Sequence, residues 1–220
     1  MNLEQLIEPT IPILRSADTV ADALRMMSET HYAKLPLVED GVYLNLLREA
    51  DLLDIDDEDT TLVDCQIPVF RPSCYIKAHP FDAIKAAIQF NLPVVPLLGD
   101  RQEYIGSVSR ASLLGFMGEN GGLTEPGGII ILEVQPRDYV LSQIAKIAEN
   151  EEFKILNVRV YHNPQTEMLE VTLKLNKTAV QSLVAALERY EYLIKAVYGD
   201  MPAQDYLDDR YRLLINYLNI

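Results

Sequence analysis

The stretch Tyr43 to Leu53, YLNLLREADLL, returns 61 residues later as YIGSVSRASLL, from Tyr104 to Leu114. The tyrosine, the alanine and the closing Leu-Leu fall in register in the two copies. Each copy reads as a short apolar strand, a polar turn and the start of a helix. A repeat of this period that occurs only twice predicts two half-domains that cover each other's apolar faces.

The segments upstream of the two copies match as well. Asp22–Leu24 (DAL) corresponds to Asp82–Ile84 (DAI), and Pro36 corresponds to Pro96. In both copies an apolar stripe at helical spacing is followed by two short apolar runs that are typical of strands. The predicted order of each copy is therefore helix, strand, turn, strand, helix.

Composition and charge narrow the possible partners. The chain has 33 acidic and 19 basic residues, a net charge of −14, and such a surface repels nucleic acid and anionic lipid. No apolar run approaches the roughly 20 residues that a membrane-spanning helix needs. The first ten residues, MNLEQLIEPT, lack the basic and apolar regions of a signal peptide. We expect a cytoplasmic protein that binds neither nucleic acid nor membranes.

A glycine-rich stretch separates the repeat from a different pattern. Gly115 to Gly128 (GFMGENGGLTEPGG) predicts a flexible linker and a domain boundary. After it, apolar periodicity predicts strand, helix, strand, strand, helix, strand, which is the ferredoxin-like arrangement with both helices on one face of an antiparallel sheet. The last residues, Ala203 to Ile220, predict a helix whose apolar stripe needs a partner surface. The fold class is α+β.

These patterns divide the chain into predicted segments. The paired repeat spans residues 1–118, with copies at about 5–58 and 66–118, and is followed by a linker at 119–128, the ferredoxin-like domain at 129–200 and a helical tail at 201–220.

The first copy contains the motifs DAL and LPLV, and the second contains DAI and VPLL. Through these motifs, residues 5–118 resemble a pair of CBS domains. Residues 129–200 resemble an ACT domain through their strand and helix order. The combination is similar to the bacterial CBS–ACT regulatory proteins, which include acetoin-utilisation-type proteins. The resemblance implies a regulator that senses a ligand, and it implies an adenosine-containing ligand such as AMP, ADP, ATP or S-adenosylmethionine between the CBS copies.

In nucleotide-binding CBS domains a turn motif, G-h-x-T/S-x-x-D, places its hydroxyl on phosphate and its aspartate on ribose. The first copy has Asn45 for the glycine and Arg48 for the hydroxyl residue, and it keeps Asp51. A carboxylate such as Asp51 can accept two hydrogen bonds from a cis-diol, and Arg48 can offer a full charge to phosphate.

The second copy keeps Gly106 and Ser109 but has Ser112 in place of the aspartate. The helix that follows offers backbone amides and a positive dipole to phosphate. Pro36 and Pro96 are interpreted as strand ends, beside which the backbone can face an adenine.

Simpler interpretations stay open for these residues. Asp51 and Ser112 can be plain helix caps, worth about 1 kcal/mol each, and Arg110 can be a solvated charge. The CBS pair is then an interaction scaffold without a ligand. A third hypothesis is an amino-acid sensor acting through the ACT-like domain. Ligand-binding ACT domains usually have a glycine after their first strand, however, and this chain has PRD at residues 136–138.

Neither catalysis nor a resident cofactor finds support in the sequence. His31, His79 and His162 lie in unrelated contexts without metal-ligand spacing, and no nucleophile or phosphate-loop motif occurs. We therefore predict no catalytic residues, no metal and no cofactor. An exposed sheet edge in the ACT-like domain favours a homodimer. The protein that this regulator would control is not identified by the sequence.

Overall fold

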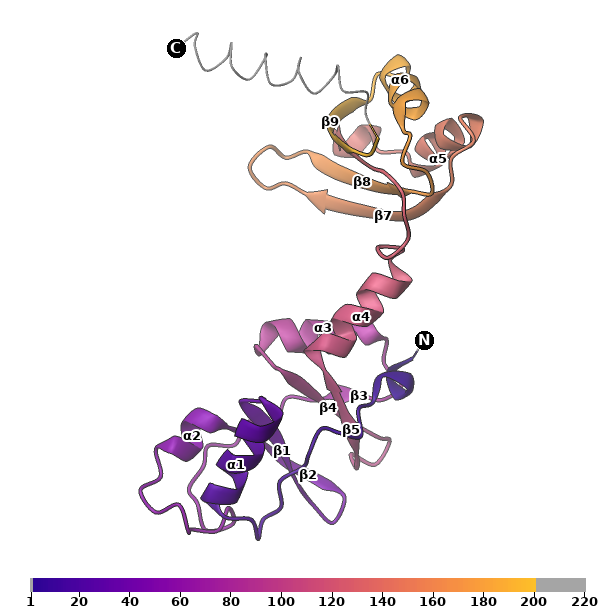
Figure 1. Cartoon of the computed structure of the whole chain (residues 1–220). Coiled ribbons are helices and arrows are strands. Elements are labelled where there is room, and N and C mark those ends of the chain that lie inside the picture. The colour runs from indigo at the N-terminus through magenta and orange to yellow at the C-terminus, as the bar shows by residue number, and fades with distance from the viewer. Residues whose placement is uncertain (1, 201–220) are drawn as a thin grey trace. The chain divides into compact units, whose positions relative to one another are not determined.

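The computed structural model of the chain describes residues 2–200, which divide into two compact units between Met117 and Gly118. The first unit contains η1 (Leu3–Leu6), α1 (Val20–Thr30), β1 (Lys34–Glu39), β2 (Val42–Arg48), α2 (Glu49–Leu53), β3 (Cys74–Tyr75), α3 (Pro80–Gln89), β4 (Val94–Leu98), β5 (Tyr104–Ser109) and the start of α4 (Arg110–Asn120). Figure 1 shows the two copies of the repeat as successive helix, hairpin and helix.

The two copies share one sheet pattern. In each, two strands form an antiparallel hairpin, β1 with β2 and β4 with β5. An extended residue from upstream pairs in parallel with the first hairpin strand, Leu14 with Leu37 and Cys74 with Leu97. The order predicted from the repeat is confirmed.

The prediction that Pro36 and Pro96 end strands is wrong. Pro36 lies inside β1 opposite Leu46, and Pro96 lies inside β4 opposite Ser107. The Pro36 carbonyl accepts a hydrogen bond from the Leu14 N–H at 2.8 Å. The Pro36 nitrogen points to that same edge, so the hairpin loses no ladder bond through the missing N–H.

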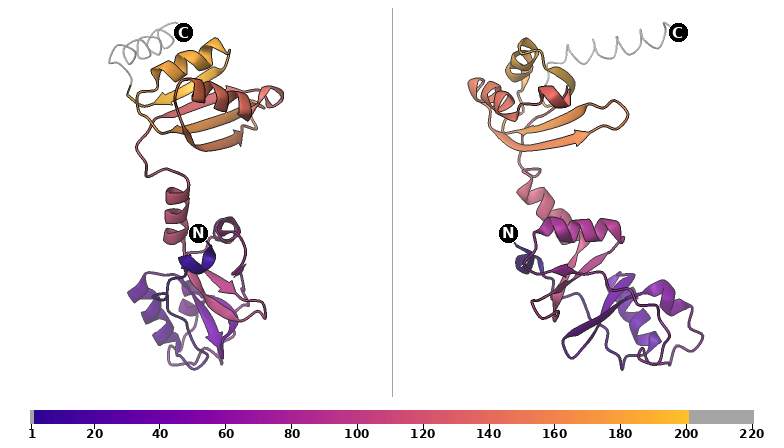
Figure 2. Two further views of the ribbon diagram at one scale, coloured as in Figure 1. Left: turned by 90° about the vertical axis from the view of Figure 1, so that its right-hand side faces the viewer. Right: turned by 180° about the vertical axis from the view of Figure 1, so that it is seen from behind.

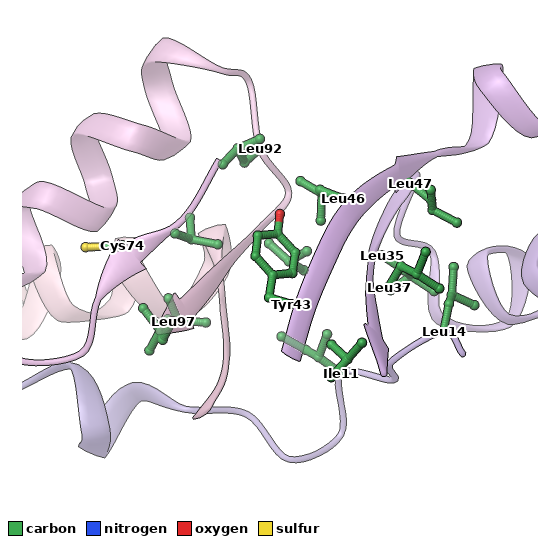
Figure 3. Close-up of a cluster of buried hydrophobic side chains, with 14 of the residues drawn as sticks. Ile11, Leu14, Leu35, Leu37, Tyr43, Leu46, Leu47, Cys74, Leu92 and Leu97 are labelled. Carbon is green, nitrogen blue, oxygen red and sulfur yellow. The ribbon is translucent and has the colours of Figure 1, made fainter. Parts of the chain in front are cut away.

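A single apolar core joins the two copies. Figure 3 shows Tyr43 and Leu46 on the side of β2 that faces Leu92 and Leu97 of the second copy. The Tyr43 hydroxyl donates to the Pro72 carbonyl at 3.0 Å, and burial raises the pKa of this phenol above its usual range. Because the shared face is apolar and buried, neither copy covers its own core without the other.

The segment before each copy lies on the other copy. On the first copy, the side chain of Asn45 holds the connecting segment, since its Nδ2 donates to the Pro68 carbonyl at 3.2 Å and its Oδ1 accepts from the Phe70 N–H at 2.7 Å. On the second copy, the Glu8 N–H donates to the Ser107 carbonyl at 3.0 Å.

The residue that permits this approach on the second copy is Gly106. A β-carbon on Gly106 would lie 2.8 Å from Cγ2 of Ile7, closer than real β-carbons come to their neighbours. The motif glycine of the second copy therefore makes room for the N-terminal segment, whereas Asn45 fills the equivalent place in the first copy with hydrogen bonds.

The glycine-rich stretch begins as a helix, so the expectation of a flexible linker from Gly115 is wrong for Gly115–Asn120. α4 runs to Asn120, and its buried residues Leu113 and Phe116 join the core of the first unit. These apolar contacts outweigh the low helix propensity of glycine.

The second unit is an α+β sandwich of a sheet and two helices. Its elements are β6 (Ile129–Val134), η2 (Pro136–Asp138), α5 (Leu141–Asn150), β7 (Ile155–His162), β8 (Leu169–Leu175), α6 (Gln181–Arg189) and β9 (Leu193–Tyr198). All neighbouring strands are antiparallel in the order β7-β8-β6-β9, and Figure 2 shows α5 and α6 on one face of the sheet. The predicted ferredoxin-like order is confirmed, while the predicted helix at 203–220 lies outside the described residues.

The contact between the first copy and the connecting segment can be tested by mutating Asn45. Asn45→Ala leaves the Phe70 N–H without its acceptor, and a polar group left unpaired costs about 1–3 kcal/mol. We expect the free energy of unfolding, measured with denaturant, to fall by that amount. Gln66 is exposed in the same segment, so Gln66→Ala is the matched control and should change it by less than about 0.5 kcal/mol. An Asn45→Ala protein as stable as the control would contradict this role.

Candidate functional site

The turn of the first copy is closed by an internal ion pair. Nε of Arg48 lies 2.6 Å from Oδ2 of Asp51, and Nη2 of Arg48 lies 2.8 Å from Oδ1. Both carboxylate oxygens thus accept from one guanidinium, a bidentate geometry that is among the stronger ion pairs. The ribose contact proposed for Asp51 would have to replace these two bonds.

Asp51 is not a helix cap, so that prediction is wrong. α2 begins at Glu49, its N-cap is Arg48, and no side chain caps it. Asp51 is the third residue of the helix and turns back to Arg48, three residues earlier, instead of to a backbone amide.

Phe70, from the segment that connects the copies, lies beside two cations. The Arg48 guanidinium carbon is 5.4 Å from the centroid of the Phe70 ring, and Nζ of Lys34 is 5.6 Å from it. Lys34 also reaches the second copy, where its Nζ donates to the carbonyls of Phe90 at 3.3 Å and Asn91 at 2.9 Å. Lys34 therefore links both copies at this place.

A third cation, Arg110, lies close to Lys34. Nε and Nη2 of Arg110 donate to the Leu92 carbonyl at 3.0 and 2.8 Å, and Nη2 also donates to Oδ1 of Asn91 at 2.9 Å. Arg110 is exposed, which agrees with its interpretation as a solvated charge, and its guanidinium also donates to the turn that follows α3. Burial lowers the pKa of Lys34, and the charges of Arg48 and Arg110 lower it further. These three residues form what we call the cation cluster: Lys34, Arg48 and Arg110.

The turn of the second copy holds a carboxylate from the N-terminal segment. The Ser109 N–H donates to Oε1 of Glu8 at 3.1 Å, and the Ser112 hydroxyl donates to the same oxygen at 2.5 Å. Ser109 Oγ accepts from the Ser112 N–H at 3.0 Å. Ser109 therefore caps α4, and the prediction that Ser112 is the cap is wrong because its hydroxyl is directed to Glu8.

The carboxylate of Glu8 is bound as an anion. Burial by itself would raise the pKa of this carboxyl, but the hydrogen bonds from Ser109 and Ser112 outweigh burial and hold the pKa below its usual value. The position also lies at the N-terminus of α4, where unpaired amides and the helix dipole favour negative charge. The second turn is thus a place where this acidic protein stabilises a negative group.

The structure groups the predicted site residues in two sets. Arg48 and Asp51 lie together at the first turn, Ser109 and Ser112 lie together at the second, and Gly106 contacts Ile7 instead of facing open space. Pro36 and Pro96 are buried within their strands.

Three residues of the site escaped prediction from the sequence, namely Glu8, Lys34 and Phe70. Glu8 has no local signal, since its partner Ser112 is 104 residues away. The signal that could have found Lys34 is its position one residue before the LPLV strand. Phe70 could have been found as the aromatic residue of the segment between the copies.

The second unit has a cavity of about 340 Å³ beside residues 136–138, the turn at which the third hypothesis places an amino acid. Glu133, Asp138 and Glu191 are among its lining residues. Three carboxylates repel the carboxylate of an amino acid, and this argues against that ligand. Within residues 2–200 no three or more His, Cys, Asp or Glu side chains are grouped to hold a metal ion, and no helix there is long and apolar enough to cross a membrane.

Comparison with known proteins agrees with this fold. Residues 3–58 match the CBS domain family. A CBS domain pair/ACT domain protein from Thermotoga maritima is similar at 18% identity and a TM-score of 0.50, over 54% of this chain and 98% of that chain. CBS domains of a transcriptional regulator from Streptococcus pneumoniae are similar at 19% identity and a TM-score of 0.46, over 52% of this chain and 98% of that one. CBSX2 from Arabidopsis thaliana is similar at 15% identity and a TM-score of 0.45, over 54% and 94%. The N-terminal half therefore has the fold of a CBS domain pair, and the chain begins with a CBS domain.

Proposed function

We propose that this protein is a regulator and not an enzyme, and that its CBS pair binds an adenosine nucleotide such as AMP, ADP or ATP. The phosphate would lie at the second turn, against the Ser109 N–H and the Ser112 hydroxyl. The observation that carries the proposal is the Glu8 carboxylate, which is held by those two donors at 3.1 and 2.5 Å. An anion already occupies the position that a phosphate oxygen would take.

The choice between the two turns follows from their geometry. The second turn leads directly into α4, a helix of 11 residues, whereas α2, which follows the first turn, has only five. A longer helix presents a fuller set of aligned peptide dipoles to an anion. Both turns already hold a carboxylate, but Asp51 at the first turn is bound twice by a charged guanidinium, whereas Glu8 at the second turn is bound by two neutral donors and is the easier one to displace.

The cation cluster supports a phosphate-bearing ligand over a neutral one. In a chain of net charge −14, Lys34, Arg48 and Arg110 are brought together from both copies. Asp51 already pairs with Arg48, so the charges of Lys34 and Arg110 remain, and an anion relieves the repulsion between them. The CBS fold of this half supports a ligand that contains a nucleoside. S-adenosylmethionine is the alternative ligand that contains adenosine but no phosphate.

Binding would act on the regulator by population shift. A nucleotide that prefers one arrangement of the two CBS copies stabilises that arrangement by the difference in its affinities. The signal would pass to the ACT-like unit, and from there to a protein target.

Nucleotide binding is tested with AMP, ADP, ATP, S-adenosylmethionine and the common amino acids, by thermal unfolding and calorimetry. A ligand at about 100 times its dissociation constant stabilises the protein by roughly 2.7 kcal/mol, which is a few degrees in melting temperature for this size. Ser112→Ala is made together with Glu8→Ala, so that no carboxylate shares the donor. It removes one hydrogen bond to phosphate and should weaken binding about fivefold to tenfold relative to Glu8→Ala alone.

The control for this experiment is Ser28→Ala, because Ser28 is an exposed serine of α1 in the same unit. It should leave the affinity unchanged. A shift with S-adenosylmethionine alone would move the ligand away from phosphate, and a shift with amino acids alone would move it to the ACT-like unit. No shift with any compound would contradict nucleotide sensing and favour the scaffold.

A second candidate function, a dimerising scaffold, is favoured by an apolar groove between α3 and α4. The groove has a volume of about 360 Å³ and its apolar lining includes Ile84, Leu113 and Met117. Two more of its residues, Ile88 and Leu114, are 76% and 73% exposed. Large apolar side chains gathered on one surface are typical of an interface, and a second copy of the chain offers a matching one.

The scaffold is tested by the mass of the protein in solution. We expect analytical ultracentrifugation to give a dimer, and Ile88→Glu with Leu114→Glu to give a monomer, because a charge buried in an apolar interface is strongly unfavourable. Leu53→Glu is the control, since Leu53 is 66% exposed on α2 outside the groove, and it should leave the dimer intact. A monomeric wild type would contradict this function.

A further inference from the structure

We propose that Glu8 competes with the ligand's phosphate, so that the N-terminal segment limits access to the second turn. This inference rests on the proposed function, because it requires a phosphate-bearing ligand at that turn. It adds a regulatory element to that function, since the protein carries its own anion in the ligand's place.

The competition follows from the number of donors. The Ser109 N–H and the Ser112 hydroxyl each have one proton, and both donate to the single oxygen Oε1 of Glu8. A phosphate oxygen is an acceptor of the same kind and charge. Because neither donor can fully serve two anions, and because two anions at one helix N-terminus repel each other, Glu8 and the phosphate exclude each other.

The segment that carries Glu8 is anchored on both sides of this residue. Leu3 and Leu6 of η1 are buried in the core of the first unit, and Ile11 is buried after the turn. The backbone of Glu8 is fixed as well, through its N–H to the Ser107 carbonyl and through its carbonyl to the Ile11 N–H at 3.1 Å. Only the Glu8 side chain, which is half-buried, needs to rotate away for a phosphate to enter.

In the first copy the covering segment brings no carboxylate to the turn. There the covering segment brings Phe70, whose carbonyl accepts from the Leu46 N–H at 2.8 Å and whose ring lies near Arg48. The carboxylate at the first turn is Asp51 of the turn itself, which is paired with Arg48, whereas Glu8 reaches the second turn from the covering segment. The proposed competition is therefore specific to one of the two copies.

Competition of this kind weakens the apparent affinity without changing the bound state. The apparent dissociation constant equals the intrinsic one divided by the fraction of molecules in which the turn is free. Removing the charge of Glu8 should therefore tighten nucleotide binding, by about tenfold for one charged hydrogen bond.

The experiment measures ATP and AMP affinity by calorimetry for the wild type, Glu8→Gln and Glu8→Ala. Glu8→Gln keeps the size of the side chain and loses its charge, and Glu8→Ala also loses the acceptor. If one variant fails to fold, the other still gives the affinity without the Glu8 charge. Both should bind ATP about tenfold more tightly than the wild type. Adding Ser112→Ala to Glu8→Gln should reverse part of the gain, because the phosphate then loses that donor.

The matched control is Glu4→Gln, which makes the same change in net charge from an exposed position in the same segment. It should leave the affinity within about twofold of the wild type, since an exposed charge at a distance is screened by salt. An equal gain in Glu4→Gln would show a general charge effect and overturn the competition.

The remaining outcomes separate the inference from its premise. If the wild type binds ATP and the Glu8 variants bind no more tightly, the competition is wrong and nucleotide sensing stands. If no variant binds ATP or AMP, the proposed nucleotide site is wrong, and the competition fails with it.

Discussion

The first unit depends on an exchange of segments, because the residues that precede each CBS copy lie on the other copy. Asn45 fixes the connecting segment to the first copy through Pro68 and Phe70, and the Glu8 backbone fixes the N-terminal segment to the second copy. The shared apolar core behind these contacts makes the two copies one folding unit. Each turn is therefore shaped by a segment that is distant in sequence.

This exchange explains how much of the fold the sequence could predict. The hairpins and helix starts were predictable, because the repeat from Tyr43 and Tyr104 expresses local periodicity and turn chemistry. Local chemistry also begins α1, where the Thr19 side chain accepts from the Asp22 N–H three residues later. The helical form of Gly115–Asn120 was not predictable, because it depends on tertiary contacts of Leu113 and Phe116 that outweigh glycine's low propensity.

The candidate site was predictable only in part, for the same physical reason. The motif residues were found because they stand at fixed positions in a repeated turn, but their partners were not. Ser112 meets Glu8 across 104 residues, and a carboxylate between Ile7 and Pro9 gives no local sign of that contact. Asp51 resembled a cap, and only the geometry shows that Arg48 takes both of its oxygens.

The central claim is that the second turn stabilises an anion, and the most direct measurement is the pKa of the Glu8 carboxyl by NMR, with and without ATP. In the free protein the hydrogen bonds from Ser109 and Ser112 should hold this pKa below 4.5, its value in an unperturbed side chain. With ATP bound the pKa should rise, because the carboxylate loses both donors and gains a negative neighbour. A pKa at or above 4.5 in the free protein would contradict the account, since the turn would then give no net stabilisation to a negative charge.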